Sequence, residues 1–271
     1  MSANGASAGR VDLHNHLMPG VDDGAPDLEA SRRGLAAMQA EGIERLAVTP
    51  HFDASLTERP DALERRLGEL DRGWEALSGL ARAEFPRVEV SRAAEVMLDM
   101  PEPDLSDPRL RLGGGPFVLV EFPFALSAAF SGPALAAVRS GGWTPVVAHP
   151  ERYTAIPNLV RTADAWRSAG AYLQVNGLSL LGRYGAEAKA SAEALFEAGL
   201  VDYLASDFHA RGRPLVREYA EALRRACTEE IVELLTRTNP GRILNGETPI
   251  PVGAVRLRRH LWQRLIGGWR P

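Results

Sequence analysis

The sequence predicts a single α/β domain built on parallel strands, and we expect these strands to form a distorted barrel. Seven runs with strand character alternate with stretches of helix character along the 271 residues. Histidines and acidic residues stand at the ends of most of these runs. An open, doubly wound sheet is the alternative. We prefer the barrel because it brings all strand ends to one rim, where these side chains can converge on one point.

The expected strands are short apolar, β-branched or alternating runs, at residues 11–16, 43–50, 88–96, 117–122, 144–149, 171–175 and 201–206. The segments between them are rich in Ala, Leu, Glu and Arg, and several begin near Asp, Ser or Pro, as helices do. We expect helices over residues 27–40, 60–82, 131–140, 158–169, 185–198 and 214–226. Gly42, Gly170 and Gly199 come just before three of the strands, where helices often end on a left-handed glycine.

The composition is that of an ordinary soluble globular protein, with 45% hydrophobic and 24% charged residues. The 31 basic and 35 acidic residues leave a formal charge of −4, which gives no electrostatic reason to expect nucleic acid as a partner. Cys227 is the only cysteine, so no internal disulfide can form and a reducing compartment is the simple interpretation. The first ten residues lack the apolar core of a signal peptide. We therefore expect a cytoplasmic protein.

The chain shows no linker that would divide it, and we expect one domain over residues 11–250 between two short end segments. Residues 1–10 have the composition of a disordered segment. Residues 251–271 form a basic tail, which predicts either an amphipathic helix on a membrane surface or a partner, or a last helix packed on the domain. The tail mixes basic and apolar residues: Arg256, Arg258, Arg259 and Arg264 with Leu257, Leu261, Trp262, Leu265 and Ile266.

Five of the six histidines stand at strand-like ends, which indicates a metal site. His14 and His16 lie two residues apart in VDLHNH, and alternation along a strand puts both on one face. Carboxylates complete the set, and oxygen and nitrogen ligands without cysteine suit Mn²⁺, Fe²⁺ or Zn²⁺. A single buried histidine is more often a core residue, but this recurrence argues against that reading. The remaining candidate ligands are His51, His149, His209, Glu95, Glu121, Asp207 and an aspartate of the VDDG turn.

The series DLHNHLMPGVDDG, TPH, AAE, VEF, AHPERY, QVN and SDFH resembles the bacterial PHP (polymerase and histidinol phosphatase) protein tyrosine phosphatases of capsule and exopolysaccharide systems. The resemblance implies a distorted (β/α)₇ TIM-like barrel that holds three divalent ions, usually Mn²⁺. Asp23 and Glu121 favour this subgroup, because other PHP proteins often have histidine there. The implied ligands are His14, His16, Glu95 and Asp207 for the first ion, Glu95, Glu121 and His149 for the second, and Asp23, His51 and His209 for the third.

Two arginines are the candidate catalytic residues that hold the phosphate, Arg152 of HPERY and Arg213 of the GRP turn, because a guanidinium binds two phosphate oxygens at once. Arg211 competes with Arg213 for this role, and a surface salt bridge is the alternative for both predicted arginines. Asn176 either orients substrate or caps a turn. No protein nucleophile is required, because metal ions can activate water. His51 is a candidate proton donor to the leaving group if it does not bind metal.

We therefore expect metal-dependent hydrolysis of phosphotyrosine in proteins, with a membrane-associated bacterial tyrosine kinase as the substrate. Cys227 is not a nucleophile of the C-x₅-R type, because Glu233 stands where the arginine would be. A phosphatase for a small phosphomonoester such as histidinol phosphate is the second hypothesis. A PHP domain that acts only as a scaffold is the third, and the full set of ligands argues against it.

Overall fold

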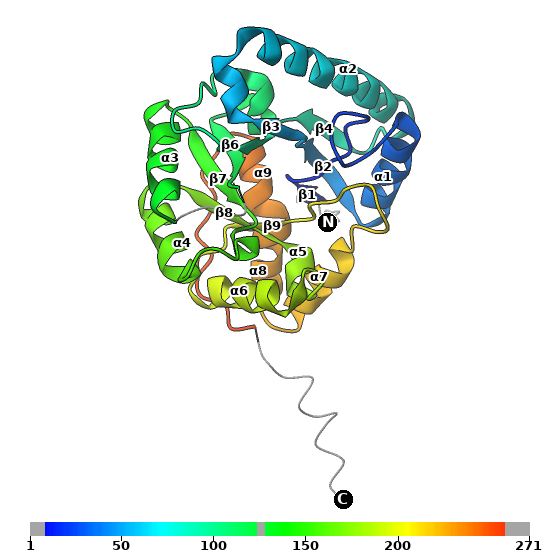
Figure 1. The fold of residues 1–271 in the computed structure, drawn as a ribbon. Coiled ribbons are helices and arrows are strands. Elements are labelled where there is room, and N and C mark those ends of the chain that lie inside the picture. The colour runs from blue at the N-terminus through cyan, green and yellow to red at the C-terminus, as the bar shows by residue number, and fades with distance from the viewer. Residues whose placement is uncertain (1–8, 124–127, 258–271) are drawn as a thin grey trace, which may run out of the picture.

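The computed structural model describes residues 9–123 and 128–257. Its strands lie at the centre of the molecule, and the helices surround them (Figure 1). The strands are β1 Arg10–Asp12, β2 Ile43–Val48, β3 His51–Asp53, β4 Glu89–Arg92, β5 Glu95–Met97, β6 Phe117–Glu121, β7 Thr144–Ala148, β8 Tyr172–Asn176 and β9 Tyr203–Ala205. The predicted α/β class with alternating strands and helices is confirmed.

The larger helices match the expected ones to within a few residues. They are α1 Leu28–Ala40, α2 Pro60–Glu84, α3 Ala128–Ser140, α4 Leu159–Ser168, α6 Gly185–Glu197 and α7 Val216–Arg224. The shorter ones are α5 Gly177–Leu180, α8 Glu229–Glu233, α9 Asn239–Leu244, the 3₁₀ turns η1 Ala54–Glu58, η2 Pro108–Leu110, η3 Leu112–Gly114 and η4 Pro150–Arg152, and the π-helix η5 Leu234–Thr238.

Local chemistry explains where these helices begin and end. The side chain of Asp27 accepts a hydrogen bond from the backbone nitrogen of Ala30 at 2.7 Å and so caps the start of α1. Pro60 stands in the first turn of α2, where its missing N–H costs no helical hydrogen bond. Gly42, Gly170 and Gly199 all have positive φ after α1, α4 and α6, which confirms them as the predicted helix ends.

All paired strands are parallel, in two sheets with the orders β1-β2-β4 and β3-β5-β6-β7-β8-β9. Two of the predicted strands are each divided into two, 43–50 into β2 and β3, and 88–96 into β4 and β5. Pro50 stands in the first interruption and lacks the N–H that a ladder needs. Backbone hydrogen bonds bridge both interruptions, from Ala93 to Val48 at 2.9 Å and from Glu95 to Pro50 at 3.1 Å.

The segments that follow β1 and β9 are also hydrogen-bonded to each other. The backbone nitrogen of Asp207 donates to the carbonyl of His14 at 2.8 Å, and that of His16 donates to the carbonyl of Phe208 at 2.9 Å. The predicted strand 11–16 therefore continues beyond β1 as a bridge to the end of β9. These bonds link the outer strand of one sheet to the outer strand of the other.

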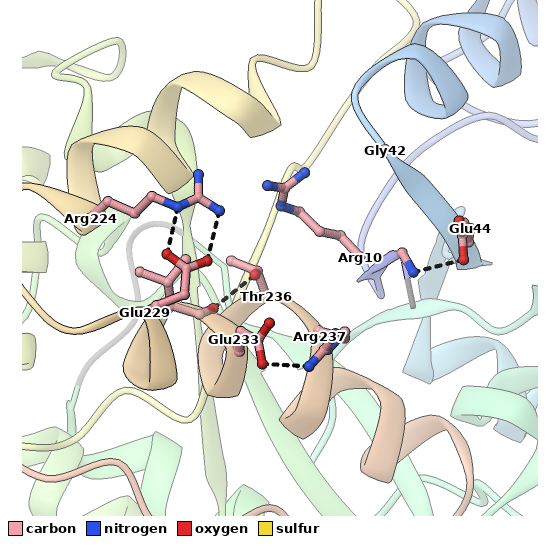
Figure 2. Close-up of a pocket in the computed structure, with 10 residues that line it drawn as sticks. Arg10, Gly42, Glu44, Arg224, Glu229, Glu233, Thr236 and Arg237 are labelled. Carbon is pink, nitrogen blue, oxygen red and sulfur yellow. Dashed lines mark hydrogen bonds and ion pairs between the residues drawn. The ribbon is translucent and has the colours of Figure 1, made fainter. Parts of the chain in front are cut away.

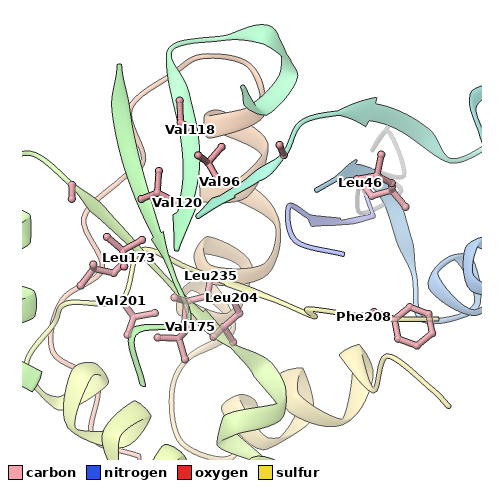
Figure 3. Close-up of a cluster of buried hydrophobic side chains, with 14 of the residues drawn as sticks. Leu46, Val96, Val118, Val120, Leu173, Val175, Val201, Leu204, Phe208 and Leu235 are labelled. Atoms are coloured by element: carbon pink, nitrogen blue, oxygen red, sulfur yellow. The ribbon is translucent and has the colours of Figure 1, made fainter. Parts of the chain in front are cut away.

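Side chains on opposite faces of the strands enter two different cores. One face supplies residues such as Val118, Val120 and Leu173, which belong to the large apolar cluster shown in Figure 3. The other face supplies Phe117 and Leu119 of β6, which pack in a smaller cluster with residues of β7, β9 and α9. This period-two alternation gives each central strand two buried faces, as expected for a parallel sheet covered by helices.

Helix α9 is absent from the sequence prediction. Pro240 and Gly241 disfavour helix there, so local propensity gives a weak signal. Tertiary contacts compensate, because the side chain of Asn239 bonds to the backbone of Asp202 and Ile250, and Ile243 enters the smaller core.

The predicted end segments are described only in part. Residues 251–257 run without helix, and the backbone nitrogen of Val255 donates to Phe196 at 2.9 Å. The tail residues 258–271 and residues 1–8 lie outside the described residues. Among the helices of residues 9–123 and 128–257, none is long and apolar enough to cross a membrane.

Candidate metal centre

The predicted ligands meet at the carboxyl ends of the strands. The alternation that places Phe117 and Leu119 in the smaller core places Glu121 next on the same face. Asp207 follows Tyr203 and Ala205 of β9 in the same way. The strand face that forms the smaller core is thus apolar along the strands and polar at their carboxyl ends. Parallel α/β folds carry their active sites at these ends.

The first group joins His14, His16 and Asp207, all of them buried. The Nε2 atoms of the two histidines are 3.3 Å apart, and they lie 3.3 and 3.4 Å from Oδ1 of Asp207. Oε2 of Glu95 completes the group at 3.1 Å from Nε2 of His14 and 3.4 Å from Nε2 of His16. The four residues predicted for the first ion therefore lie together.

Glu95 also connects this group to the residues predicted for the second ion. Its Oε1 lies 2.8 Å from Nε2 of His149. Glu121 is more distant from His149, at 4.0 Å between Oε2 and Nε2, and its Oε1 lies 3.1 Å from Nδ1 of His51. Glu95 is thus central to the whole cluster, because it contacts residues expected for the first ion and for the second.

The third group contains Asp23, His51 and His209, and His16 joins it. Oδ1 of Asp23 lies 3.4 Å from Nε2 of His209 and 3.6 Å from Nε2 of His51. The side chain of Asp23 is 61% exposed, whereas those of His14 and His16 are fully buried. The cluster therefore runs from a buried end at His14 to an open end at Asp23. His51 contacts both the second and the third group.

The charges of the cluster depend on each other. Burial alone would raise the pKa of Glu95, but the nearby histidines, His14 first, hold it well below its usual range. Burial likewise opposes ionisation of Asp207, and His14 and His16 lower its pKa. Burial lowers the pKa of His14, yet Glu95 and Asp207 raise it to about 9. Buried carboxylates of this kind require positive charge beside them, either protons on the histidines or cations.

The donor atoms fit divalent cations. Oε2 of Glu95 lies within 3.4 Å of imidazole nitrogens of His14, His16 and His51 but is aligned for a hydrogen bond with none of the described residues. The Nε2 atoms of His14 and His16, which are 3.3 Å apart, also converge on one point. Four overlapping sets of these residues each have donor atoms within 4.8 Å of one another: His14, His16 and Asp207; His14, Glu95 and His149; His51, Glu95 and Glu121; and His16, Asp23, His51 and His209. Imidazole and carboxylate donors at these separations are suited to Mn²⁺, Fe²⁺ or Zn²⁺.

Two side chains that the sequence reading did not select orient the first histidines. Oε1 of Gln174 lies 2.9 Å from Nδ1 of His14, and Oδ2 of Asp22 lies 2.8 Å from Nδ1 of His16. An acceptor at Nδ1 leaves the lone pair of Nε2 directed at the site, which is the usual arrangement around metal-binding histidines. Gln174 is two residues before Asn176 on the same strand face, and Asp22 precedes Asp23. Their positions beside predicted site residues are the feature of the sequence that could have identified them.

The backbone is left-handed at two of the ligands, with φ of 34° at His149 and 52° at Asp207. Non-glycine residues adopt this conformation rarely, and such strain is concentrated at functional sites. His149 directly follows β7, and Asp207 lies two residues after the end of β9.

The three predicted substrate residues have different surroundings. Nη1 of Arg152 donates to Oδ2 of Asp207 at 2.8 Å, and its guanidinium lies 4.5 Å from the ring centre of Tyr184. Asn176 is fully buried and donates from Nδ2 to the same Oδ2 at 2.8 Å. Arg152 and Asn176 therefore contact the metal cluster itself, through Asp207.

Arg213 lies away from these groups. Its Nη2 is 2.9 Å from Glu41 and 3.0 Å from Glu218, and its side chain is 64% exposed. Glu41 precedes β2 and His51 follows it, so this guanidinium is at the opposite end of β2 from the site. Arg211 is closer, because its Nη2 donates to the backbone carbonyl of Asp23 at 2.6 Å.

A separate cavity of about 270 Å³ lies near the start of β1, between β2 and the helices α7 and α8 (Figure 2). Arg224 binds Glu229 through two nitrogens at 2.7 and 2.9 Å, and Arg237 binds Glu233. None of the nine predicted ligands, all of which are described, lines it. Because its charges are largely compensated in pairs, this cavity is a weaker candidate for the functional site than the histidine cluster.

Comparisons with known proteins show the family to which the chain belongs. The family model of capsular polysaccharide synthesis proteins CpsB/CapC matches residues 10–245. The tyrosine-protein phosphatase YwqE of Bacillus subtilis is 30% identical over 207 residues, which cover 73% of this chain and 77% of YwqE. The tyrosine-protein phosphatase CpsB of Streptococcus agalactiae is 27% identical over 206 residues, covering 73% and 82% of the two chains.

A solved structure shares the fold as well. It comes from work on YwqE of Bacillus subtilis and CpsB of Streptococcus pneumoniae, described as unique metal-dependent tyrosine phosphatases. It superposes with a TM-score of 0.70 at 26% identity and covers 90% of this chain and 99% of its own. The motifs, the fold and the family match lead to one conclusion: this chain belongs to the CpsB/CapC family of capsular polysaccharide synthesis proteins.

Proposed function

We propose that this protein is a metal-dependent phosphatase that hydrolyses phosphotyrosine in proteins. The observation that carries the proposal is the convergence of five histidines and four carboxylates on one rim, in a chain of the CpsB/CapC family. The similar proteins YwqE and CpsB are named tyrosine-protein phosphatases, which supports the substrate class.

The site would hold three divalent ions, with Mn²⁺ as the first choice. The buried group of His14, His16, Glu95 and Asp207 would bind the first ion, and Glu95, Glu121 and His149 the second. The more open group of Asp23, His51 and His209 would bind the third. Bound divalent ions would neutralise charge on phosphate oxygens and activate water near neutral pH. The absence of cysteine from the cluster agrees with such hard ions.

Arginine side chains beside the metal ligands would bind the phosphate. Arg152 has a planar guanidinium next to Asp207, and this group would bind two phosphate oxygens. Arg211, on the carbonyl of Asp23, is closer to the site than Arg213 and is the better second candidate. The side chain of His51 is 40% exposed and reaches the open end of the cluster, but as a ligand of the third ion it would not serve as proton donor to the leaving tyrosine oxygen.

The fold supports a more specific architecture than two parallel sheets. We infer one distorted (β/α)₇ barrel, in which β2 with β3 and β4 with β5 each form one interrupted strand. Counted this way, seven strands follow one another. The hydrogen bonds between His14, His16, Asp207 and Phe208 would close the ring between its first and last strands.

The natural substrate would be a phosphorylated bacterial tyrosine kinase of a capsule or exopolysaccharide system, presented at the membrane. The family description of capsular polysaccharide synthesis supports this choice. We place the reaction in the cytoplasm, because a chain with Cys227 as its only cysteine suits a reducing compartment.

Hydrolysis of a phosphotyrosine peptide and of histidinol phosphate, each with Mn²⁺ and with EDTA, tests the proposal. We expect a higher kcat/KM for the peptide, and no activity in EDTA. Preference for histidinol phosphate would favour the second hypothesis. A protein that hydrolyses neither, while an Asp207→Ala variant still restores capsule synthesis in a deletion strain, would favour the scaffold.

A further inference from the structure

We propose that Gln174 and Asn176 form a buried amide chain that positions His14 and Asp207 for metal binding. This inference rests on the proposed metal-dependent function, and it assigns to Asn176 a role other than contact with substrate. The chain has four members in order, His14, Gln174, Asn176 and Asp207. They come from three different parts of the sequence, after β1, within β8 and after β9.

The contacts along this chain are short and continuous. Nδ1 of His14 donates to Oε1 of Gln174 at 2.9 Å. Nε2 of Gln174 donates to Oδ1 of Asn176 at 2.8 Å, and Nδ2 of Asn176 donates to Oδ2 of Asp207 at 2.8 Å. Gln174 and Asn176 are fully buried, so solvent does not compete for these bonds.

The Asp207 end sets the direction of every bond. A carboxylate only accepts, so Asn176 must turn its NH₂ group to Asp207 and its oxygen to Gln174. Gln174 must then give its NH₂ group to Asn176, which leaves its oxygen facing His14. That oxygen needs a donor, so Nδ1 of His14 keeps its proton, and the lone pair of its neutral form lies on Nε2, the atom that faces the cluster.

The same chain determines which oxygen of Asp207 is available. Oδ2 accepts from both Asn176 and Arg152, each at 2.8 Å. Oδ1 is left to face Nε2 of His14 and of His16 at 3.3 and 3.4 Å. One amide chain therefore presents two ligand atoms of the first group in the required orientation. Hydrogen bonds of this kind, from residues that do not bind the ion themselves, hold metal ligands in position.

Glu151 anchors this chain from the HPERY segment. Its Oε1 accepts from the backbone nitrogen of Asn176 at 2.9 Å and from Oγ of Ser179 at 2.7 Å. Asn176 is thus held by its backbone as well as by both ends of its amide, and its full burial keeps its side chain from solvent-borne substrate.

Calorimetric titration with Mn²⁺ tests the inference independently of activity. Gln174→Met and Asn176→Leu keep the approximate volume and remove the hydrogen bonds. We expect the tightest Mn²⁺ site to weaken by about 10–100-fold in each. Because the amide chain acts as a unit, the double variant should have an Mn²⁺ dissociation constant within about threefold of that of the weaker-binding single variant. Its loss of affinity should not be the product of the two single losses. Losses of Mn²⁺ binding free energy that add up in the double variant would contradict a continuous amide chain.

Asn239→Leu is the matched control, because Asn239 is also a fully buried asparagine with three hydrogen bonds but lies in α9. It should lower thermal stability and leave the Mn²⁺ dissociation constants unchanged. If Gln174→Met does not fold, Gln174→Asn preserves the amide but shortens its reach, and the same loss of affinity is expected.

Two failures are distinguishable. A wild-type protein that binds no Mn²⁺ and hydrolyses no phosphotyrosine overturns the proposed function together with this inference. A wild-type protein that does both, with Gln174 and Asn176 variants that bind Mn²⁺ like the control, overturns this inference alone.

Discussion

Arg152 and Arg213 were predicted for the same role but have different surroundings. Arg152 donates to Asp207 within the cluster, whereas Arg213 is exposed and engaged by Glu41 and Glu218. We expect Arg152→Ala to lower kcat/KM for a phosphotyrosine peptide by about 100-fold or more, because it removes a charged donor to the phosphate. Arg213→Ala should change kcat/KM by less than about threefold, and steady-state kinetics of both variants provide the check.

Arg152→Lys separates charge from geometry. Lysine keeps the charge but cannot donate in a fork, so it should recover only part of the activity. An Arg213→Ala variant as inactive as Arg152→Ala would show that the loop containing Arg213 moves toward the site when substrate binds.

The buried histidines also predict how metal affinity depends on pH. Burial lowers the pKa of His14, but Glu95 and Asp207 raise it to about 9, above the ordinary value of 6.5. The protonated form thus stabilises the ion-free protein fully below pH 6.5, and this contribution is lost as the pH rises through 9. Metal must displace that proton, so Mn²⁺ affinity should rise with pH up to about 9.

Titration calorimetry in buffers of different ionisation enthalpy measures this directly. We expect at least about one proton released per protein on Mn²⁺ binding at pH 7. A binding enthalpy that is independent of the buffer would contradict a protonated His14 in the ion-free site.

At the scale of elements, α2 holds the open end of the cluster together. Arg66 donates from Nη1 to the carbonyl of Val21 at 2.8 Å and from Nη2 to the carbonyl of His51 at 2.6 Å. It therefore joins the VDDG turn to β3, the two segments that supply Asp23 and His51. Arg66→Met should weaken the third metal site by about tenfold while the first site keeps its affinity.

The neighbouring Arg65 offers a control on the same helix, because it is exposed. Metal content after dialysis against limiting Mn²⁺ distinguishes the variants. Arg65→Met should retain as many ions as wild type, and Arg66→Met should retain about one fewer. Equal retention by both would show that the turn is held without this arginine.

At the scale of the whole molecule, metal binding should stabilise the fold. The site joins segments from β1 to β9, so an ion that binds only the folded chain stabilises it by about 2.7 kcal/mol at 100 times its dissociation constant. For a domain of this size that corresponds to a Tm increase of about 5–10 °C per ion. Thermal unfolding in Mn²⁺ and in EDTA measures the difference.

Two variants test whether the increase in Tm comes from the buried metal group. Asp207→Ala should lose most of the Mn²⁺-dependent shift, because it removes a ligand of the buried group. Asn239→Leu should start from a lower Tm and keep the full shift. A wild-type Tm that is the same in Mn²⁺ and EDTA would argue against an ion in the buried group.

Much of the molecule follows from local sequence. Alternation of apolar residues identified the positions of the strands, and Gly42 marked the end of α1 as expected. The helical segment that contains Pro240 was missed because its stability comes from Asn239 and Ile243, which act through distant contacts. Local propensity contains no information about such contacts.

The sequence by itself determined the class of fold and the residues that could bind metal, because residue type and period-two alternation are local properties. Only the tertiary structure decided which contacts each of these residues makes. It placed Glu95 between His14 and His149, attached Arg152 and Asn176 to Asp207, and directed Arg213 toward Glu41. The reason is geometric, since hydrogen bonds between segments as distant in the chain as His14 and Gln174 depend on strand register, which the whole fold sets.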